Sequence, residues 1–343
     1  MKNKIILDTD MVGDDILALI VANNHPNLDL LGVTTVNGAS GSVEHASQIA
    51  LAILDYLGSE VKVFKGNDSP LEEVKKDGEQ LGDPVNFFEE LRDSLGSRLD
   101  LMNANIDEQI RVYEEQYAVD YLISESKRNK GELSIVATGP LTNLAEAILK
   151  DSEFSKNVKR LYILGGTFKV PGNITPVVEY NIFADPEAAQ IVFNSNIDIV
   201  LVPLDVCETN TYADSMLTRD ELSDLIHRFE DDEKSSKICK FIADKFSIYI
   251  DVWRKYFAFK GFPIDDVIPV MLAADESYCE YSDYLHIDVA TQGILTRGQT
   301  IAYEGKQIYK LKNSHIRNVR ISKDIRGSRI IEDMIGAITK TFK

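Results

Sequence analysis

The chain has 343 residues, 44% of them hydrophobic, which is enough for a large core in one big α/β domain or two smaller ones. Lys and Arg number 37 against 55 Asp and Glu, and the net charge of −18 disfavours nucleic-acid phosphates or an anionic membrane as the main partner. The three cysteines are too few and too scattered for a disulfide scaffold or a zinc site.

No segment of the sequence resembles a targeting signal or a membrane anchor. The chain opens with MKNKIILDTD, in which charged residues lead straight into a strand without an apolar region ahead of a cleavage site. No apolar run reaches the length of a membrane span. We therefore expect a soluble cytoplasmic protein.

The first predicted unit is a strand, a turn and a helix that together carry four carboxylates. The apolar residues 5–7 predict a buried strand, and the apolar-rich residues 16–22 predict a helix. Between them lie Asp8, Asp10, Asp14 and Asp15, with Gly13 in the turn. Carboxylates this close repel one another and lose hydration on burial, so we expect a hard divalent cation among them. Capping of the helix alone would need only one or two of these acids.

Strands and helices alternate along the rest of the chain. Apolar and β-branched runs predict strands, and apolar residues at helical spacing predict helices. The predicted strands cover residues 28–36, 61–64, 133–137, 161–164 and 197–203, and the predicted helices cover residues 43–57, 114–127, a segment opening at Asp185, and most of 218–259. Strands separated by helices indicate an α/β fold with a mostly parallel central sheet flanked by helices.

Residues 67–113 interrupt this alternation. Charged residues dominate there, several glycines and a proline break the pattern, and only residues 87–95 predict a short helix. Long segments of this kind in compact domains are either functional or mobile. We interpret residues 67–113 as a surface insertion or lid, with a plain acidic loop as the equal alternative.

Short motifs follow several of the predicted strands. Because parallel strands end at one edge of a sheet, the motif that follows the strand 133–137 is expected beside the first acidic turn. In chain order the motifs are TGPLTN (138–143), Gly165-Gly166, Gly172-Asn173, EYN (179–181), DPEAA (185–189), LDV (204–206), Asp266 ahead of the apolar residues 267–274, and Thr296-Arg297-Gly298. Together with DTD (8–10) and Asp14-Asp15, they resemble the inosine-uridine-preferring nucleoside hydrolase family, in that family's order.

The resemblance implies a fold, a reaction and a cofactor. The fold would be the open, Rossmann-like nucleoside hydrolase architecture, formed as a single domain over residues 1–343. The reaction would be calcium-dependent hydrolysis of the N-glycosidic bond of a small-molecule ribonucleoside. A homodimer or homotetramer is also implied, and no nucleic-acid or membrane partner is expected.

Carried onto this sequence, the resemblance gives the motifs individual roles. Ca²⁺ would be bound by Asp10, Asp15, Asp266 and the backbone carbonyl of Thr138. The ribose hydroxyls would be bound by Asp14, Asn173, Glu179 and Asn181. Asp10 would also be the general base, and Asp8 would lie behind the metal site and orient its ligands. These roles suit the reaction, because an oxocarbenium-like sugar requires a deprotonated water and negative charge near the ring.

The sequence departs from the family at two turns near the acids. Met11-Val12-Gly13 stands where the family commonly has Pro-Gly, so a displaced glycine must remodel the turn. The family asparagine after the second strand falls on Ala39, and Asn37, two residues earlier, is the candidate substitute for binding ribose.

The residues for base recognition depart most. Pyrimidine-accepting subfamilies have His immediately before the late Asp and purine-selective ones can have Trp, but this chain has Asp265, and none of its five histidines falls in a site motif. We expect Asp265 to accept hydrogen bonds from purine nitrogens, and purine nucleosides to be hydrolysed faster than pyrimidine nucleosides. Tyr249, Trp253 and Tyr256 follow helical spacing, which fits a core stripe for at least two of them, or the lining of a base pocket.

Two other functions fit part of the sequence. Asp8-Thr9-Asp10-Met11-Val12 also satisfies the haloacid dehalogenase-type phosphatase pattern, with Asp8 as the nucleophile and magnesium bound by both acids, but TGPLTN, EYN and DPEAA are then unexplained. A nucleoside-binding protein that lacks turnover would keep the metal and ribose sites and lose the acid that protonates the leaving base.

Overall fold

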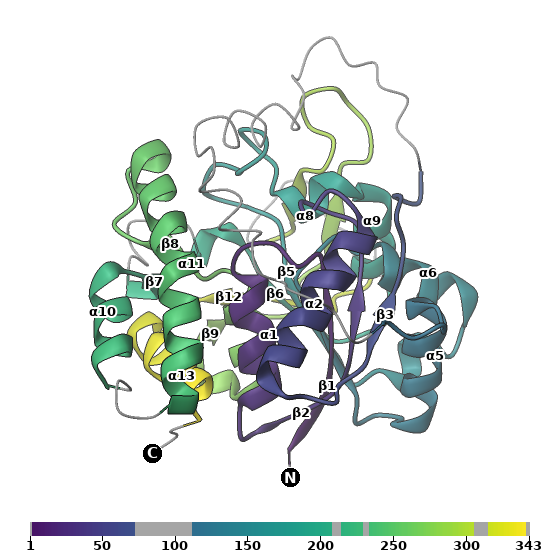
Figure 1. Ribbon diagram of the computed structural model, residues 1–343. Helices are drawn as coiled ribbons and strands as arrows, with labels where there is room; N and C mark the ends of the chain where they lie inside the picture. The colour runs from purple at the N-terminus through teal and green to yellow at the C-terminus, as the bar shows by residue number, and fades with distance from the viewer. Residues whose placement is uncertain (1, 73–111, 208–213, 229–232, 305–314, 341–343) are drawn as a thin grey trace.

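A twisted sheet carries the fold of the computed structural model, which describes residues 2–72, 112–207, 214–228, 233–304 and 315–340 (Figure 1). Within these ranges it has eight strands, in the order β3 (Val63–Lys65), β2 (Leu28–Thr35), β1 (Asn3–Thr9), β4 (Ser134–Ala137), β5 (Arg160–Leu164), β6 (Ile199–Val202), β12 (Val319–Lys323) and β9 (Glu280–Tyr281). All neighbours pair in parallel except β12 and β9. The predicted α/β fold with a mostly parallel sheet is confirmed.

Two hydrophobic cores lie on opposite faces of this sheet because successive side chains of a strand point to opposite sides. Ile5 and Leu7 of β1 enter one core, and Ile6 enters the other. The first core is covered by α1 (Asp15–Asn24), α2 (Val43–Leu57), α10 (Arg219–Arg228), α11 (Glu233–Phe257), α12 (Val267–Ala274) and α13 (Gly327–Thr339). The second is covered by α5 (Ala118–Arg128), α6 (Thr142–Lys150), α7 (Phe154–Asn157) and α9 (Pro186–Phe193) (Figure 1).

Several short elements connect these layers. They are α8 (Tyr180–Ala184), η1 (Leu204–Val206), η3 (Glu276–Tyr278), and the two-stranded pairs β7 (Met216–Leu217) with β8 (Phe262–Pro263) and β10 (Ile287–Val289) with β11 (Thr300–Ala302). Among the described helices, none combines the length and the apolar character that crossing a membrane requires.

Most predicted elements form within a few residues of their expected bounds, and α2 spans the predicted residues 43–57. The predicted start of the helix at residue 114 is wrong, because Glu114 forms a parallel bridge with Phe64 and α5 begins only at Ala118. Glu114 therefore pairs with the edge of the sheet and is not part of the helix. The strand β12 and the helix α13 were not predicted.

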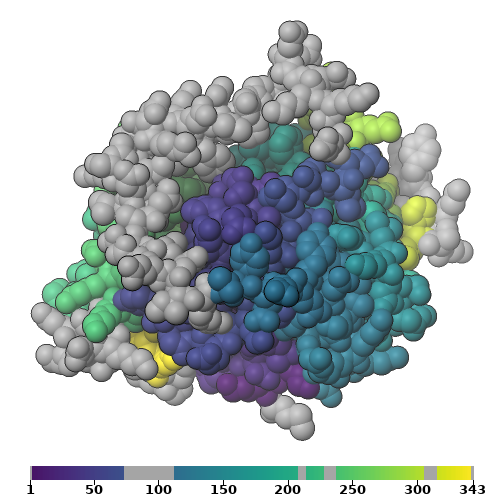
Figure 2. Space-filling model, turned by 45° about the vertical axis from the view of Figure 1, so that its right-hand side comes forward, coloured from purple at the N-terminus to yellow at the C-terminus, as the bar shows by residue number. Residues whose placement is uncertain are grey.

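Of the segment interpreted as an insertion or lid, the structure describes the two ends, residues 67–72 and 112–113. At the first end the Leu71 N–H donates to Asp185 Oδ2 at 2.9 Å, and at the second end the Tyr113 hydroxyl donates to Glu44 Oε2 at 2.9 Å. Figure 2 shows the chain that follows residue 111 beside α2 at the surface. The short helix predicted over residues 87–95 lies outside the described residues.

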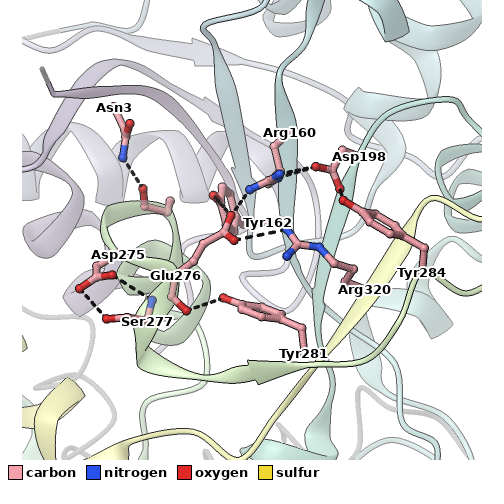
Figure 3. A network of polar contacts seen from close by, with 11 residues as sticks. Asn3, Arg160, Tyr162, Asp198, Asp275, Glu276, Ser277, Tyr281, Tyr284 and Arg320 are labelled. Carbon is pink, nitrogen blue, oxygen red and sulfur yellow. Dashed lines mark hydrogen bonds and ion pairs between the residues drawn. The ribbon is translucent and has the colours of Figure 1, made fainter.

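A network of charged and aromatic side chains joins the amino ends of β5, β6 and β12, at the sheet edge opposite the carboxyl ends (Figure 3). Arg160 Nε donates to Asp198 Oδ2 at 2.7 Å, and Arg160 also pairs with Glu276. Glu276 further accepts from the Tyr162 hydroxyl at 3.0 Å and from Arg320 at 3.3 Å. Glu276 therefore ties η3 to two strands of the sheet.

We expect Glu276→Ala to lower the free energy of unfolding by about 1–2 kcal/mol, since two half-buried guanidinium groups lose a charged acceptor. The carboxyl ends of the strands should be undisturbed, because the network lies at the other edge of the sheet. Urea unfolding checks this, with Glu153→Ala as control, since Glu153 forms an exposed ion pair with Lys156. An equal loss of stability in both variants would contradict a special role for Glu276.

Candidate active site

The carboxyl ends of β1, β2, β4 and β5 bring the sequence motifs to one edge of the sheet. Asp8 of β1 lies opposite Thr34 of β2 and Ala137 of β4 in the strand register. Residues 9–15, the turn between β2 and α2, and the TGPLTN motif therefore lie side by side at this edge. We call residues 9–15 the acidic turn.

Two residues of the acidic turn have left-handed backbone. Gly13 has φ of 59°, and Met11, which is buried, has φ of 54°. The displaced glycine thus takes one left-handed position, and a methionine takes the other at a cost in backbone strain. Asp14 precedes α1 without capping it through its side chain, so helix capping does not explain the acids.

Asp15 is fixed by three hydrogen bonds. Its Oδ1 accepts from the hydroxyls of Thr9 and Thr138, each at 2.6 Å, and its Oδ2 accepts from the Val12 N–H at 2.8 Å. Thr138 begins the TGPLTN motif, so this contact joins the first and fourth strands at the site. Neither threonine hydroxyl was given this role from the sequence.

Asp10 lies against the turn between β2 and α2. The Ala39 N–H donates to Asp10 Oδ2 at 2.7 Å. A Cβ atom on Gly38 would lie 2.1 Å from the same oxygen, so only glycine lets the turn approach this closely. Ala39, where the family has asparagine, therefore contacts the acid through its backbone.

The fourth acid comes from the other end of the chain. Asp266, which precedes α12, donates its N–H to Asp14 Oδ2 at 2.7 Å. Asp266 Oδ1 is buried and has no hydrogen-bond partner within the described ranges. The structure therefore brings Asp10, Asp14, Asp15 and Asp266 into one neighbourhood.

Burial and mutual repulsion raise the pKa values of these acids. Burial, followed by the charge of Asp15, raises the pKa of Asp14 to about 7 and holds that of Asp10 well above its usual range. Burial and the neighbouring Asp14 hold the pKa of Asp266 well above its usual range as well. Ionised together, the four carboxylates need a compensating positive charge.

In the described part of the chain, no Lys or Arg side chain forms an ion pair with any of these four acids. The compensating charge is therefore not supplied in that way. The oxygen-only chemistry of these acids, with a buried and unpartnered oxygen on Asp266, fits a hard divalent cation. As the side chains stand, no three acidic, imidazole or thiol groups in the described ranges are gathered closely enough to hold an ion together.

The EYN motif lies at the start of α8 and faces the same edge. Buried Glu179 accepts from the N–H groups of Asn181, Ile182 and Gly166 at 2.8–3.1 Å, and burial raises its pKa to about 7. The Asn181 amide donates to the Thr138 carbonyl at 3.0 Å. Asn181 is thereby placed beside the backbone oxygen that the resemblance assigns to calcium.

Asn173 and Asn37 have structural contacts of their own. Exposed Asn173 accepts from the Tyr180 N–H at 2.9 Å, which orders the start of α8. The Asn37 amide nitrogen donates to the Asp68 carbonyl at 2.8 Å, whereas its Oδ1 is buried and lacks a hydrogen bond within the described residues.

Aromatic rings line the turn on the side of Asp14. A Cβ on Gly13 would lie 3.3 Å from the Phe262 ring and 3.9 Å from Tyr249, and Trp253 packs edge-on to Phe262 with centroids 4.9 Å apart. Tyr249 and Trp253 also pack against the first core, whereas Tyr256 is 43% exposed. Half-buried Asp265 directly precedes Asp266 in the turn before α12.

Over residues 5–332 the chain matches the family described as inosine-uridine preferring nucleoside hydrolase. It is 32% identical to uridine nucleosidase 1 of Arabidopsis thaliana over 303 residues, 88% of this chain and 82% of that protein. Among solved structures it is similar to a plant nucleoside hydrolase, with a TM-score of 0.81 and 27% identity over 99% of both chains. A purine-preferring ribonucleoside hydrolase from Gardnerella vaginalis gives a TM-score of 0.82 and 26% identity over 98% of both chains.

These likenesses overturn the phosphatase alternative. Asp8, its required nucleophile, is fully buried, and Thr34 and Asn143 both donate to its Oδ1. The family match instead accounts for TGPLTN, EYN and DPEAA as well as for the first acidic turn. The chain belongs to the inosine-uridine preferring nucleoside hydrolase family and is a nucleoside hydrolase.

Proposed function

We propose that this nucleoside hydrolase releases the base from ribonucleosides at the carboxyl edge of its sheet, with Asp10 as general base and calcium as cofactor. The observation that carries the proposal is that Asp10, Asp14 and Asp15 lie close to Asp266. Asp266 is 252 residues after Asp14 in the chain. Negative charge concentrated at one point suits a reaction whose transition state is an oxocarbenium-like sugar.

Asp10 would take the proton of the attacking water. The Ala39 N–H fixes Asp10 Oδ2, which orients the carboxylate, and burial raises its pKa toward that of an effective base. The water oxygen would then attack the anomeric carbon as the bond to the base nitrogen breaks, and the departing base would take a proton from an aromatic or solvent-linked donor.

The ribose hydroxyls would be bound by Asp14, Asn37, Asn173, Glu179 and Asn181. Asp14 and Glu179 are acceptors for hydroxyl protons, and the buried Oδ1 of Asn37 offers a further acceptor. The Asn181 amide donates to the Thr138 carbonyl, and Thr138 in turn donates to Asp15, so Asn181 lies close to the acids. Several charged hydrogen bonds share the sugar, so loss of Glu179 or Asn181 should mainly weaken binding.

Calcium would be bound by Asp10, Asp15, Asp266 and the carbonyl of Thr138. When bound, it makes a water easier to deprotonate and orients sugar hydroxyls. We expect calorimetry to show calcium binding by the purified protein, and Asp266→Asn to weaken it by about 10–100-fold or more, since a charged ligand is lost. Equal calcium affinity in wild type and Asp266→Asn would contradict this ligand set.

The base would lie against Tyr249, Trp253 and Phe262, with Asp265 accepting hydrogen bonds from purine nitrogens. We keep the proposal that purines are preferred because this wall offers a broad aromatic surface. The printed names of relatives divide on this point, since one is a uridine nucleosidase and another is purine-preferring.

A substrate panel tests the activity and the preference together. We expect inosine to be hydrolysed to base and ribose faster than uridine, without need of phosphate. Asp265→Ala should reduce inosine turnover more than that of p-nitrophenyl riboside, whose leaving group has no purine nitrogen to donate a hydrogen bond to Asp265 and needs no protonation. Uridine turnover that is strong and collapses in Asp265→Ala would make Asp265 the leaving-group acid. Binding of nucleosides without ribose release would favour the binding-protein alternative.

Two further properties are proposed from the sequence. They are a homodimer or homotetramer, which the resemblance implies and light scattering tests, and a cytoplasmic location, which fractionation of the source cells tests. The interpretation of residues 67–113 as an insertion or lid is likewise a proposal, and deletion of residues 73–111 followed by measurement of KM tests it.

A further inference from the structure

The side chain of Asn143 joins the ends of several strands below the proposed catalytic site. Its Nδ2 donates to Asp8 Oδ1 at 2.8 Å and to the Thr35 carbonyl at 3.0 Å. Its Oδ1 accepts from the N–H of Asn67 at 2.9 Å and from the Asn67 amide at 3.1 Å. Asn143 itself lies in α6, directly after β4, so one amide links β1, β2, β4 and the loop that follows β3.

This amide has no exposed surface, and its surroundings leave no room for a different arrangement. Asn143 and Asp8 are both fully buried. A Cβ atom on Gly66 would lie 2.3 Å from Asn143 Oδ1 and 2.4 Å from the Thr35 carbonyl, so the loop after β3 passes in direct contact. An amide supplies both donors and an acceptor in one plane, which a carboxylate or a hydroxyl cannot do.

The contact reaches the proposed general base by two short routes. Asp8 lies in β1, which ends at Thr9 immediately before Asp10, and the Thr138 N–H donates to the Asp8 carbonyl at 2.8 Å. A Cβ atom on Gly139 would lie 2.9 Å from the Asp10 backbone nitrogen, so the TGPLTN motif packs directly on Asp10. A shift of α6 against β1 would therefore move Thr138 and Asp10 relative to each other.

We propose that Asn143 is a positioning residue, whose bond to Asp8 sets the place of Asp10 for the hydrolytic step. The inference rests on the proposed function, and concerns a residue that touches neither substrate nor cation. Because Thr34 donates to the same oxygen of Asp8 at 2.6 Å, both donors pull the strand end toward β2 and α6. If the Asn143 donor is removed, the Asp8 carboxylate and the Thr35 carbonyl stay buried and each loses one hydrogen bond.

The test compares Asn143→Asp with a matched control. In N143D the acceptor toward Asn67 is kept, but the donor to Asp8 is replaced by a repelling carboxylate. We expect kcat for inosine to fall by about 10–100-fold, the usual effect of losing an outer-shell partner, with little change in KM. Asn318→Ala is the control, because Asn318 is also buried and donates to two backbone carbonyls, of Ser195 and Ile197, at 2.8 Å.

A swap of donor and acceptor separates positioning from simple loss of stability. In D8N/N143D the amide at position 8 can donate to the carboxylate at position 143, so kcat should recover by about tenfold over N143D even if the melting temperature does not. N143A provides a second folded variant if N143D fails to fold, and circular dichroism confirms folding.

Each outcome decides the inference. Loss of kcat in the Asn143 variants with recovery in the swap, and wild-type kcat in N318A, supports it. Wild-type kcat in folded N143D and N143A, or equal losses in N318A, or no recovery in the swap, overturns it while leaving the proposed function intact. Absence of ribose release by the wild type would overturn the proposed function and this inference with it.

Discussion

Asp10→Asn should abolish ribose release from every nucleoside that the wild type hydrolyses. The amide keeps the size of the side chain but cannot take a proton, and a general base alone contributes about 10²–10⁴-fold to the rate. The same change removes one of the proposed calcium ligands, so the two losses fall on one residue. A coupled assay for ribose, with a long incubation to reveal residual activity, measures the effect on kcat.

The matched control for this variant is Asp29→Asn. Asp29 is an exposed acid in β2, and its change to an amide removes the same charge without touching the site. Wild-type kcat is expected there. Unchanged turnover in Asp10→Asn, with the protein folded, would rule out Asp10 as the base.

Gly38→Ala should lower kcat by about 100-fold although it adds a single methyl group, since a displacement of about 1 Å at a reacting group costs that much. A Cβ at this position would meet Asp10 Oδ2 at 2.1 Å and the Asp10 Cβ and Cγ at 2.7 Å. The turn between β2 and α2 and the carboxylate must then separate, and the hydrogen bond from Ala39 is lost with them. Steady-state kinetics with inosine measures the loss.

Gly41→Ala is the control for this effect, because it lies in the same turn. A Cβ on Gly41 meets nothing within 4 Å, although its φ of 86° makes alanine strained there. Gly41→Ala should therefore lower the melting temperature while kcat stays close to that of the wild type. Equal losses of kcat in the two variants would show that strain in the turn, and not contact with Asp10, is responsible.

The parts of the fold and site that depend on the local pattern of residues in the sequence could be predicted. Apolar spacing located α2 at residues 43–57, and the rule that parallel strands end at one edge placed the TGPLTN motif beside Asp15, whereas Asp266 was assigned there only by the resemblance to the family. Crowding of carboxylates in one turn predicted mutual repulsion, and burial and repulsion raise the pKa of Asp10 there.

The parts that depend on register and on long-range contact could not be predicted. Thr34 reaches Asp8 only because the two residues lie opposite each other in adjacent strands, and nothing near Thr34 in the sequence marks it. Asn143 was recognised within its motif, but its role depends on the loop after β3. Helical spacing likewise did not distinguish Tyr249 from Tyr256, but Tyr249 lies beside the acidic turn whereas Tyr256 is exposed.

The central claim is that the carboxylates around Asp10 hold a cation on which hydrolysis of the N-glycosidic bond depends. Ribose release from inosine by the same preparation, before chelation, after chelation and after return of calcium, tests it most directly. We expect release to stop when the chelator has removed the cation and to return on addition of calcium, with the circular dichroism spectrum unchanged throughout. Undiminished ribose release from chelator-treated protein, with no metal detected in it by elemental analysis, would contradict the claim.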